Sequence, residues 1–176
     1  MTYFSWFEDS VIGSLFLAGT DDSLQYLVRD LRRTVLDPPL PHDDWEPAEK
    51  PFREVKKQLK SYFRGKLKAF DLPLDGQGTD FQKQVWQQLM EIPYGETVSY
   101  ADVAEAIGKP KACRAVGNAN GKNPITIIVP CHRVIASGGK PGGYGGRLDI
   151  KASLLELEGV DVSHWDDSLM PQEAIL

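Results

Sequence analysis

The stretch IIVPCHRVIASGG, residues 127–139, places a cysteine, a histidine and an arginine side by side after an apolar run. The run begins earlier, and PITIIVP at 124–130 predicts a continuous strand of the fully buried type. Pro130 ends this strand. The thiol of Cys131 would therefore be held rigidly at the edge of a hydrophobic core.

The chemistry of Cys131 depends on its neighbours. The thiolate is the nucleophilic form of cysteine, and a nearby base or cation favours it, so His132 and Arg133 could each activate the sulfur. Adjacent side chains of a strand point to opposite faces, so Cys131 and His132 meet only if the chain turns or a water bridges them. Three interpretations stay open: a small buried hydrophobe, a cysteine hydrolase dyad, or an acceptor that reacts once. Hydrolases usually bring His and Asn from distant positions, which disfavours the second.

The residues after Arg133 predict a loop and a helix. ASGGKPGGYGG at 136–146 contains six glycines and predicts a loop that could form the wall of a pocket. RLDIKASLLELEG at 147–159 predicts a helix that ends at Gly159.

Upstream, three helices are predicted. Thr79 or Asp80 can cap the first, whose apolar positions recur at helical spacing. SYAD at 99–102 is a capping box that opens the second, YADVAEAI. The third, KACRAVGNAN at 111–120, follows a turn at Gly108, and the pair is a helix-turn-helix candidate. Small residues on the third helix would allow close approach to a large partner.

Residues 1–76 predict a separate unit. GSLFLAG at 13–19 predicts a strand, and LQYLV at 24–28 predicts a second strand or the start of a helix. An exposed loop is predicted for 37–51, and PFREVKKQLKSYFRG at 51–65 predicts a helix. LDGQGTD at 74–80 has the composition of a linker. The predicted organisation is thus 1–76, 77–160 and a tail without pattern at 161–176.

Composition and charge restrict the partners. The net charge is −5, but the segment from Gly108 to Lys151 has eight basic residues and one acid, a net charge of +7. That footprint suits a polyanion or a solvated loop region. No run of about 18 apolar residues predicts a membrane span, and no signal peptide is recognisable, so a cytoplasmic protein is expected. Two cysteines and three histidines, widely spaced, predict neither a disulfide framework nor a zinc site.

An ordered series of motifs carries a resemblance to a known family. IIVPCHRVI, YGETVSYADVAEAIG, KACRAVGNANGKNP, GGYGG and KASLLELEG, between about residues 81 and 159, resemble the O6-alkylguanine-DNA alkyltransferases, or methylated-DNA–protein-cysteine methyltransferases. Residues 1–76 resemble that family's N-terminal domain only loosely. The implied fold is a small α/β, RNase H-like domain followed by a mostly helical, winged helix-turn-helix domain.

The resemblance implies a reaction and a substrate. The family moves an alkyl group from O6 of a flipped-out guanine in duplex DNA to a cysteine thiolate, once per molecule and without a cofactor. It implies that Cys131 is the acceptor, that His132 is the base that ionises it through a water, and that Glu158 orients the imidazole. Double-stranded DNA carrying alkylated guanine is the expected partner, no membrane is involved, and the protein is expected to act as a monomer.

The remaining roles carry over residue by residue. Asn123 braces the helix-turn-helix against the active-site strand, and Tyr100 lies beside the target phosphate and can donate to the guanine ring. Arg114 enters the duplex in place of the flipped nucleotide. Arg133 is implied to be a structural ion-pair partner. The DNA-binding helix also contributes Lys111, Ala112, Ala115 and Gly117, pressed into the minor groove, and the substrate pocket contains Val134, Tyr144, Gly145 and Gly146.

Two departures from the family pattern matter. Some members have a serine after the loop tyrosine, whereas this chain has Gly145, so a roomier pocket that tolerates larger alkyl groups and O4-alkylthymine is expected. The zinc ligands of some relatives have no counterpart at 1–76. Alkyltransferase-like proteins, which bind the lesion without repairing it, lack the acceptor cysteine that this chain has as Cys131. A helix-turn-helix regulator would have no use for the Pro-Cys-His-Arg stretch, and within these 176 residues no additional regulatory domain is expected.

Overall fold

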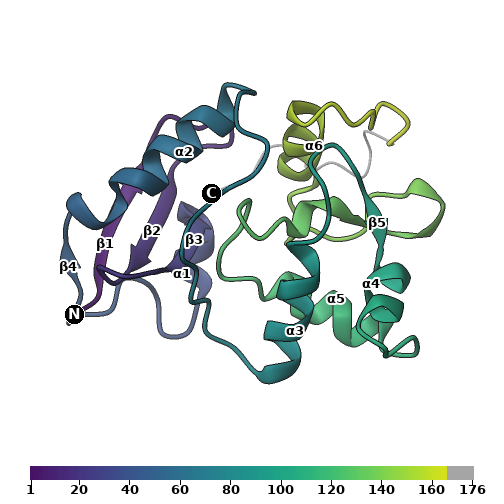
Figure 1. Ribbon diagram of the computed structural model, residues 1–176, viewed down its shortest axis with the longest axis horizontal. Coiled ribbons are helices and arrows are strands. Elements are labelled where there is room, and N and C mark those ends of the chain that lie inside the picture. Colours follow the sequence, from purple (N-terminus) through teal and green to yellow (C-terminus); the bar gives the residue numbers. More distant parts are fainter. Residues whose placement is uncertain (166–176) are drawn as a thin grey trace. The chain divides into compact units, whose positions relative to one another are not determined.

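The computed structural model describes residues 1–165 and divides into two compact units (Figure 1). One unit contains Met1–Gln77 and Pro124–Ile128, and the other contains Gly78–Asn123 and the chain from Val129 onward. The chain thus passes between the units three times, and the last passage comes just before Cys131. Most of the tail predicted at 161–176 lies outside the described residues.

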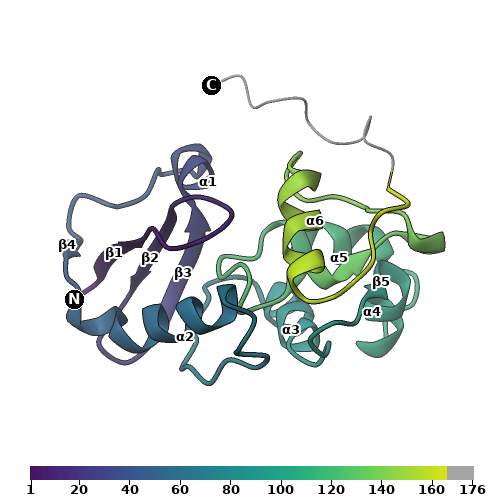
Figure 2. The same ribbon diagram turned by 90° about the horizontal axis from the view of Figure 1, so that it is seen from above.

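The N-terminal unit is built on a four-stranded sheet with the order β3-β2-β1-β4. β1 (Tyr3–Phe7), β2 (Leu15–Gly19) and β3 (Leu24–Arg29) form an antiparallel meander, and β4 (Glu46–Pro47) pairs parallel to β1. The short helix α1 (Asp30–Val35) follows β3. Figures 1 and 2 show the longer helix α2 (Arg53–Phe63) running along the sheet.

Helix α2 packs through the apolar stripe that its sequence predicts. Val55, Leu59, Tyr62 and Phe63 are buried, and the ring of Phe63 stacks on Phe7 of β1 with 6.1 Å between centroids. A 3-10 turn at Lys50–Phe52 precedes the helix, and Gly65 follows it with a φ of 72°. The predicted helix is confirmed, with its start two residues later than Pro51.

The prediction of an exposed loop at 37–51 is only partly right. Leu40 is buried in a cluster with Phe16 and Ala18 of β2 and Val28 of β3, so part of this segment packs on the sheet. Glu46–Pro47 forms β4. A two-residue strand and a single buried leucine leave no pattern in the sequence that distinguishes them from a loop.

The C-terminal unit is mostly helical. It contains α3 (Asp80–Leu89), α4 (Tyr100–Ala106), α5 (Cys113–Gly121) and α6 (Leu148–Leu157), with 3-10 turns at Cys131–Arg133 and Ser137–Gly139. The strands β5 (Val98–Ser99) and β6 (Val134–Ile135) pair in parallel. The α4–α5 pair is the predicted helix-turn-helix, and a sheet domain followed by a helical one confirms the predicted fold class.

Helix boundaries in this unit follow from capping. The Thr79 hydroxyl accepts from the backbone N–H of Gln82, and the Gln82 side chain accepts from the Thr79 N–H. Ser99 and Asp102 form the second capping box, as predicted. Each box satisfies two backbone donors that the first turn leaves free.

The prediction of a continuous strand at 124–130 is wrong, although the predicted burial is right. Ile125 makes one isolated bridge to Leu27, and Ile127 has a φ of 74°, which turns the chain. The N–H of Ile128 then bonds to the carbonyl of Thr126 at 2.9 Å. An apolar run is equally compatible with a buried strand and a buried turn, so its composition could not separate them.

Two further features limit what the chain can be. None of the helices in residues 1–165 combines the length and the apolar character that a bilayer crossing needs. After α6, the chain is packed rather than patternless as far as it is described, because Val162 and Trp165 are buried against Ala152 and Leu155.

Candidate active site

Cys131 lies at the first position of a 3-10 turn and is almost fully buried, with 2% of its surface exposed. Its N–H bonds to the carbonyl of Val129 at 2.8 Å, and its carbonyl accepts from Nδ2 of Asn120 at 3.3 Å. The turn removes the strand alternation that would have sent Cys131 and His132 to opposite faces. The sequence analysis required either a chain turn or a bridging water to bring Cys131 and His132 together, and the chain turn is present.

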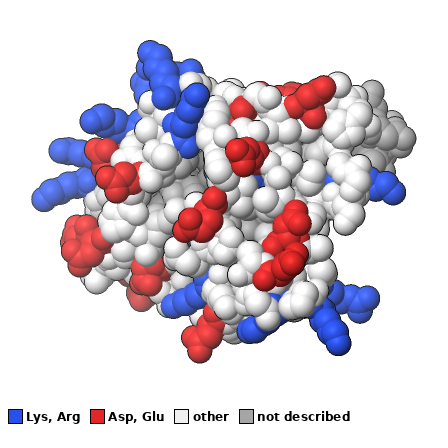
Figure 3. All heavy atoms as spheres, turned by 45° about the vertical axis from the view of Figure 1, so that its right-hand side comes forward, with Lys and Arg blue, Asp and Glu red and all other residues white. Residues whose placement is uncertain are grey.

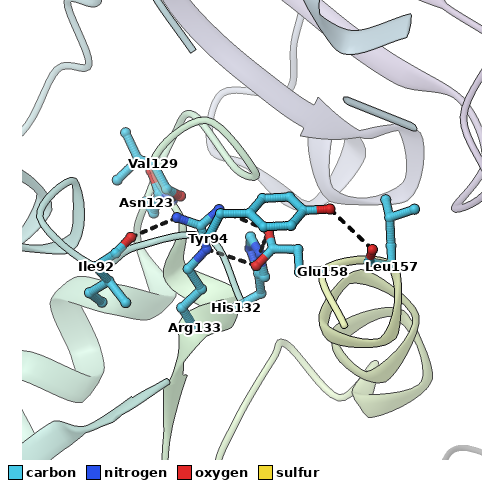
Figure 4. A network of polar contacts seen from close by, with 8 residues as sticks. All are labelled: Ile92, Tyr94, Asn123, Val129, His132, Arg133, Leu157 and Glu158. Atoms are coloured by element: carbon cyan, nitrogen blue, oxygen red, sulfur yellow. Dashed lines mark hydrogen bonds and ion pairs between the residues drawn. The ribbon is translucent and has the colours of Figure 1, made fainter. Parts of the chain in front are cut away.

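His132 is held by Glu158, the residue that follows the last turn of α6 (Figure 4). The imidazole Nε2 and the Oε1 atom of Glu158 are 2.7 Å apart, and both side chains are closed to solvent. A carboxylate only accepts, so Nε2 carries the hydrogen and Nδ1 is the acceptor. Nδ1 has no hydrogen-bond partner among the described residues. His132 is thus arranged to take up a proton at Nδ1.

Arg133 fixes the other side of the same carboxylate. Its Nε donates to Oε2 of Glu158 at 2.8 Å, one terminal nitrogen donates to Oε1 at 2.9 Å, and the other donates to the carbonyl of Ile92 at 2.7 Å. Figure 4 shows Tyr94 beside this guanidinium, with its hydroxyl donating to the carbonyl of Leu157 at 3.1 Å. Arg133 is therefore an ion-pair partner of Glu158, as the resemblance implies.

The electrostatics of this network favour a neutral imidazole at rest. Burial alone would raise the pKa of Glu158, but the hydrogen bonds and charges of His132 and Arg133 outweigh it and lower the pKa to about 2. Burial lowers the pKa of His132, against the opposing effect of Glu158, and the charges of Arg133 and Lys151 act in the same direction as burial. A neutral histidine beside an ionised carboxylate is a competent general base.

Two asparagines connect the end of α5 to the cysteine. Asn123 is fully buried, and its Nδ2 donates to the carbonyl of Val129 at 2.8 Å. This contact is of the bracing kind that the resemblance implies. Asn120 makes the bond to the Cys131 carbonyl and is a neighbour that the sequence analysis missed. Its Oδ1 is the only other buried side-chain atom, besides His132 Nδ1, without a hydrogen-bond partner in residues 1–165.

Tyr100 and Lys151 hold the glycine-rich loop. The hydroxyl of Tyr100 accepts from the N–H of Gly143 at 3.2 Å, and a Cβ at Gly142 would come within 2.8 Å of that hydroxyl, so only glycine fits there. Nζ of Lys151 donates to the carbonyls of Val134 at 2.5 Å and Gly143 at 3.2 Å. The two side chains thus bind both polar groups of one loop residue.

Lys151 was missed as a site residue. It is fully buried on α6, and burial lowers its pKa from 10.5 to about 8, while the nearby Cys131 thiolate opposes this lowering. A signal was present in the sequence: Lys151 is three residues after Leu148 and four before Leu155, on the apolar face of the helix.

The residues implied to bind DNA lie on α5 and just before it, because the helix begins at Cys113, two residues later than predicted. Lys111, Arg114 and Ala115 are exposed, while Ala112 and Gly117 are partly buried. The +7 segment is not all surface, however, because Arg133 and Lys151 are buried and Arg147 is paired with Asp149 at 2.8 Å. These three residues therefore add little to a positive surface. The exposed charge of the segment is confined to the helix-turn-helix and the loop.

The implied pocket residues differ in their exposure. Val134 is fully buried, Tyr144 is partly buried, and Gly145 and Gly146 are exposed with φ values of 58° and 77°.

Cys113 is a second thiol, partly exposed, whose Sγ lies 3.8 Å from the carbonyl of Pro110. Among residues 1–165, His, Cys, Asp and Glu side chains nowhere gather in threes as a metal site would require.

Comparison with known families matches both units to the same group of proteins. Residues 80–160 match the DNA binding domain of 6-O-methylguanine DNA methyltransferase, and residues 2–76 match the ribonuclease-like domain of 6-O-methylguanine DNA methyltransferase. The methylated-DNA–protein-cysteine methyltransferase of Methanosarcina acetivorans is 52% identical over 157 residues, which cover 89% of this chain and 98% of that protein.

Solved structures give the same answer. The crystal structure of Mycobacterium tuberculosis O6-methylguanine methyltransferase is 47% identical, covers 98% of this chain and 97% of its own, and superposes with a TM-score of 0.80. The crystal structure of Mycobacterium tuberculosis OGT in complex with DNA is 45% identical, with coverages of 97% and 96% and a TM-score of 0.80.

Proposed function

The chain belongs to the 6-O-methylguanine DNA methyltransferase family, and we propose that Cys131 is the residue that accepts the alkyl group in its reaction. The protein is a DNA repair enzyme that transfers the alkyl group of O6-alkylguanine to one of its own cysteines. The observation that supports this role of Cys131 is the buried network beside it. His132 and Arg133, the next two residues of the chain, both bind the ionised carboxylate of Glu158.

Ionisation of the thiol is the first step. The proton of Cys131 passes through a water to Nδ1 of His132, whose Nε2 hydrogen is fixed on Glu158. The imidazolium formed lies against a carboxylate that is already ionised, so no charge has to be created in isolation. Arg133 holds that carboxylate in place.

The thiolate then displaces guanine from the alkyl carbon. A sulfur–carbon bond forms as the carbon–O6 bond breaks, and the electron pair of the broken bond passes to the guanine ring. Burial raises the pKa of Tyr100, an effect that the bond from Gly143 opposes and the Cys131 thiolate reinforces, so its hydroxyl stays protonated and can donate to the departing base. The proton lost by the thiol ends on guanine, which restores the normal base.

The enzyme works once. A thioether has no acidic hydrogen and is a poor leaving group at neutral pH, so nothing in the site regenerates the thiol. The number of guanines repaired equals the number of protein molecules consumed.

DNA is bound by the helix-turn-helix. α5 enters the minor groove at three small residues, Ala112 at its N-cap and Ala115 and Gly117 within it, and Lys111 neutralises a phosphate. Arg114 fills the space left by the flipped nucleotide, at an unstacking cost of roughly a few kcal/mol. The exposure of Arg114 in the first turn of α5, and of Lys111 just before the helix, supports these roles.

The base is received between the cysteine turn and the glycine-rich loop. Main-chain groups at Cys131 and Val134 read the guanine edge, while Tyr144, Gly145 and Gly146 close over it. The bonds of Tyr100 and Lys151 to Gly143 support a loop that is held close to the sulfur. Asn123 transmits the position of α5 to the cysteine turn.

The cellular setting follows from the substrate. A protein that repairs chromosomal DNA works where that DNA is, which in a cell without a nucleus is the cytoplasm. One acceptor cysteine and one recognition helix form a complete site in a single chain, so the protein acts as a monomer.

A restriction-site assay tests this function. O6-methylguanine placed within a recognition sequence blocks cleavage, and incubation with the protein is expected to restore it, up to one duplex per protein molecule. The Cys131→Ser variant is expected to restore none. Restoration by the Cys131→Ser variant, or repair of several duplexes per molecule, would show that another group carries the reaction.

A further inference from the structure

The exposed side of α2 carries a concentration of positive charge that the reaction does not use. Seven of the eleven Lys and Arg residues in 1–77 lie between Arg53 and Lys68, beside the single acid Glu54. The remainder of 1–77 has four basic and twelve acidic residues, a net charge of −8. The N-terminal unit is thus acidic apart from one helix and the turn after it.

The basic residues lie on one face of the helix. Arg53, Lys57, Lys60 and Arg64 recur at intervals of four, three and four residues and are all exposed, while Val55, Leu59 and Tyr62 on the opposite side are buried. We call these four residues the basic face of α2. Figure 3 shows Lys and Arg side chains gathered at the upper left, at the height of α2 in Figure 1.

Within residues 1–165, ion pairs leave most of the charge of this face unneutralised. Lys56 lies next to the basic face and is fully paired: its Nζ donates to Glu49 at 2.5 Å and to the Ser5 hydroxyl at 2.7 Å. The four residues of the basic face have no contacts of this kind among residues 1–165. On the basic face, Lys60 forms an ion pair with Asp9, at 3.8 Å between two exposed side chains. Such a pair is heavily screened by water.

The arrangement also works against the helix itself. Arg53 and Lys57 are four residues apart, as are Lys60 and Arg64, and Lys57 and Lys60 are three apart. Like charges at these spacings repel and disfavour the helix. A polyanion bound along the basic face would attract each of these side chains and offset the repulsion between them.

The spacing suits a phosphate backbone. At 1.5 Å per residue the face extends about 16 Å along the helix axis. A strand of duplex DNA presents one phosphate per roughly 3.4 Å of its axis, so about five phosphates fall within that length. An acidic protein segment would need a matching row of carboxylates, whereas DNA presents this row at every sequence and is already the polymer on which the protein acts.

We propose that the basic face of α2 is a second, sequence-independent contact for the phosphate backbone of duplex DNA, in addition to the helix-turn-helix. The proposal rests on the proposed function, because it assumes that the protein works on DNA. Its role is to raise the affinity for undamaged DNA during the search for a lesion, without taking part in the transfer.

The test measures how binding of an undamaged duplex by the full chain depends on salt. Each phosphate contact contributes about 0.9 to the slope of log affinity against log salt. The triple variant K57Q/K60Q/R64Q is expected to lose up to three contacts, so the slope becomes less steep by up to about 2.7. Between about 50 and 200 mM salt the wild-type affinity should then fall about 40-fold further than that of the variant.

The control is the charge-conserving triple K57R/K60R/R64K, which should bind with the wild-type slope. All three proteins are expected to react equally fast with free O6-benzylguanine base, which needs the cysteine site but no duplex. Equal slopes for the neutralised and charge-conserving variants would overturn the proposal and leave α2 as a solvated face or a contact for an acidic protein. A wild-type protein that fails with every alkylated substrate would instead refute the proposed function.

Discussion

His132 and Glu158 are 26 residues apart in the chain, yet their side chains are joined at 2.7 Å in a place closed to solvent. This contact makes the end of α6 part of the cysteine site. It fixes which imidazole nitrogen carries the hydrogen and leaves the other one available to take a proton. Arg133 shares the same carboxylate, so base and structural ion pair form one unit.

Replacing Glu158 with Gln should slow the transfer step. The amide cannot stabilise an imidazolium as a carboxylate does, and general-base catalysis contributes about 100-fold or more. We expect the single-turnover rate on O6-methylguanine duplex to fall by about 100-fold, as measured by rapid quench. Tyr94→Phe, which removes the bond to the Leu157 carbonyl near the same network, serves as the control and should react at close to the wild-type rate. Equal rates for wild type and Glu158→Gln would remove Glu158 from the mechanism.

The same carboxylate should make the fold sensitive to acid. The pKa of Glu158 is lowered from 4.5 to about 2, so its contribution to the free energy of unfolding is complete above pH 4.5 and is lost as the pH falls through 2. Urea unfolding of wild type and Glu158→Gln should differ most near neutral pH, by about 3 kcal/mol, and the difference should shrink below pH 4.5. A difference that does not change with pH would mean that the carboxylate is not ionised in the folded protein.

Because of Lys151, the transfer rate should decline at alkaline pH and so show an alkaline limb in its pH profile. Its pKa of about 8 means that its positive charge near Cys131 disappears as the pH rises through 8, and we expect the rate to decline there. Over the same interval the unfolded chain binds more protons than the folded one, so the free energy of unfolding should rise, which separates lost activity from lost structure. Lys151→Arg keeps its charge at all these pH values and should lack the decline. The assay is the single-turnover rate from pH 6.5 to about 9.5; an unchanged limb in Lys151→Arg would assign it to another group.

Gly145 should set the tolerance for large alkyl groups. No atom lies within 4 Å of where a Cβ at Gly145 would be, so a serine fits sterically, although its φ of 58° makes any side chain cost about 1 kcal/mol. We expect the wild type to react with O6-benzylguanine and O6-methylguanine duplexes at rates within about tenfold of each other, and Gly145→Ser to favour the methyl adduct. Gly145→Ala carries the same backbone strain without the hydroxyl and is the matched control. Near-total rejection of the benzyl adduct by the wild type would refute the roomier pocket.

Much of this could be predicted from the sequence where the signal is local. The capping residues Thr79 and Ser99 lie beside the helices that they start, and the apolar stripe of α2 repeats within the helix itself. Periodicity and capping depend on neighbours a few residues away, so a single sequence contains them in full.

Other features depend on contacts between distant segments. The turn at Ile127 follows directly after Ile125 bridges to Leu27, about a hundred residues earlier, and an apolar run cannot reveal such a distant contact. Lys151 and Asn120 have polar neighbours from loops and from the cysteine turn, which their own helices do not predict. The family resemblance predicts the role of Glu158, whereas its position in the chain does not. The basic residues of α2 are present in the sequence, but only the buried face of the helix shows that four of them share one exposed side.

The most direct test of the central claim is intact-mass measurement after the protein is mixed with O6-methylguanine duplex, followed by peptide mapping. The account predicts a gain of one methyl group per molecule, located on Cys131 and not on Cys113, with no gain in Cys131→Ser and no further gain when fresh substrate is added. An unchanged mass while guanine is restored, or a methyl group on any other residue, would contradict it.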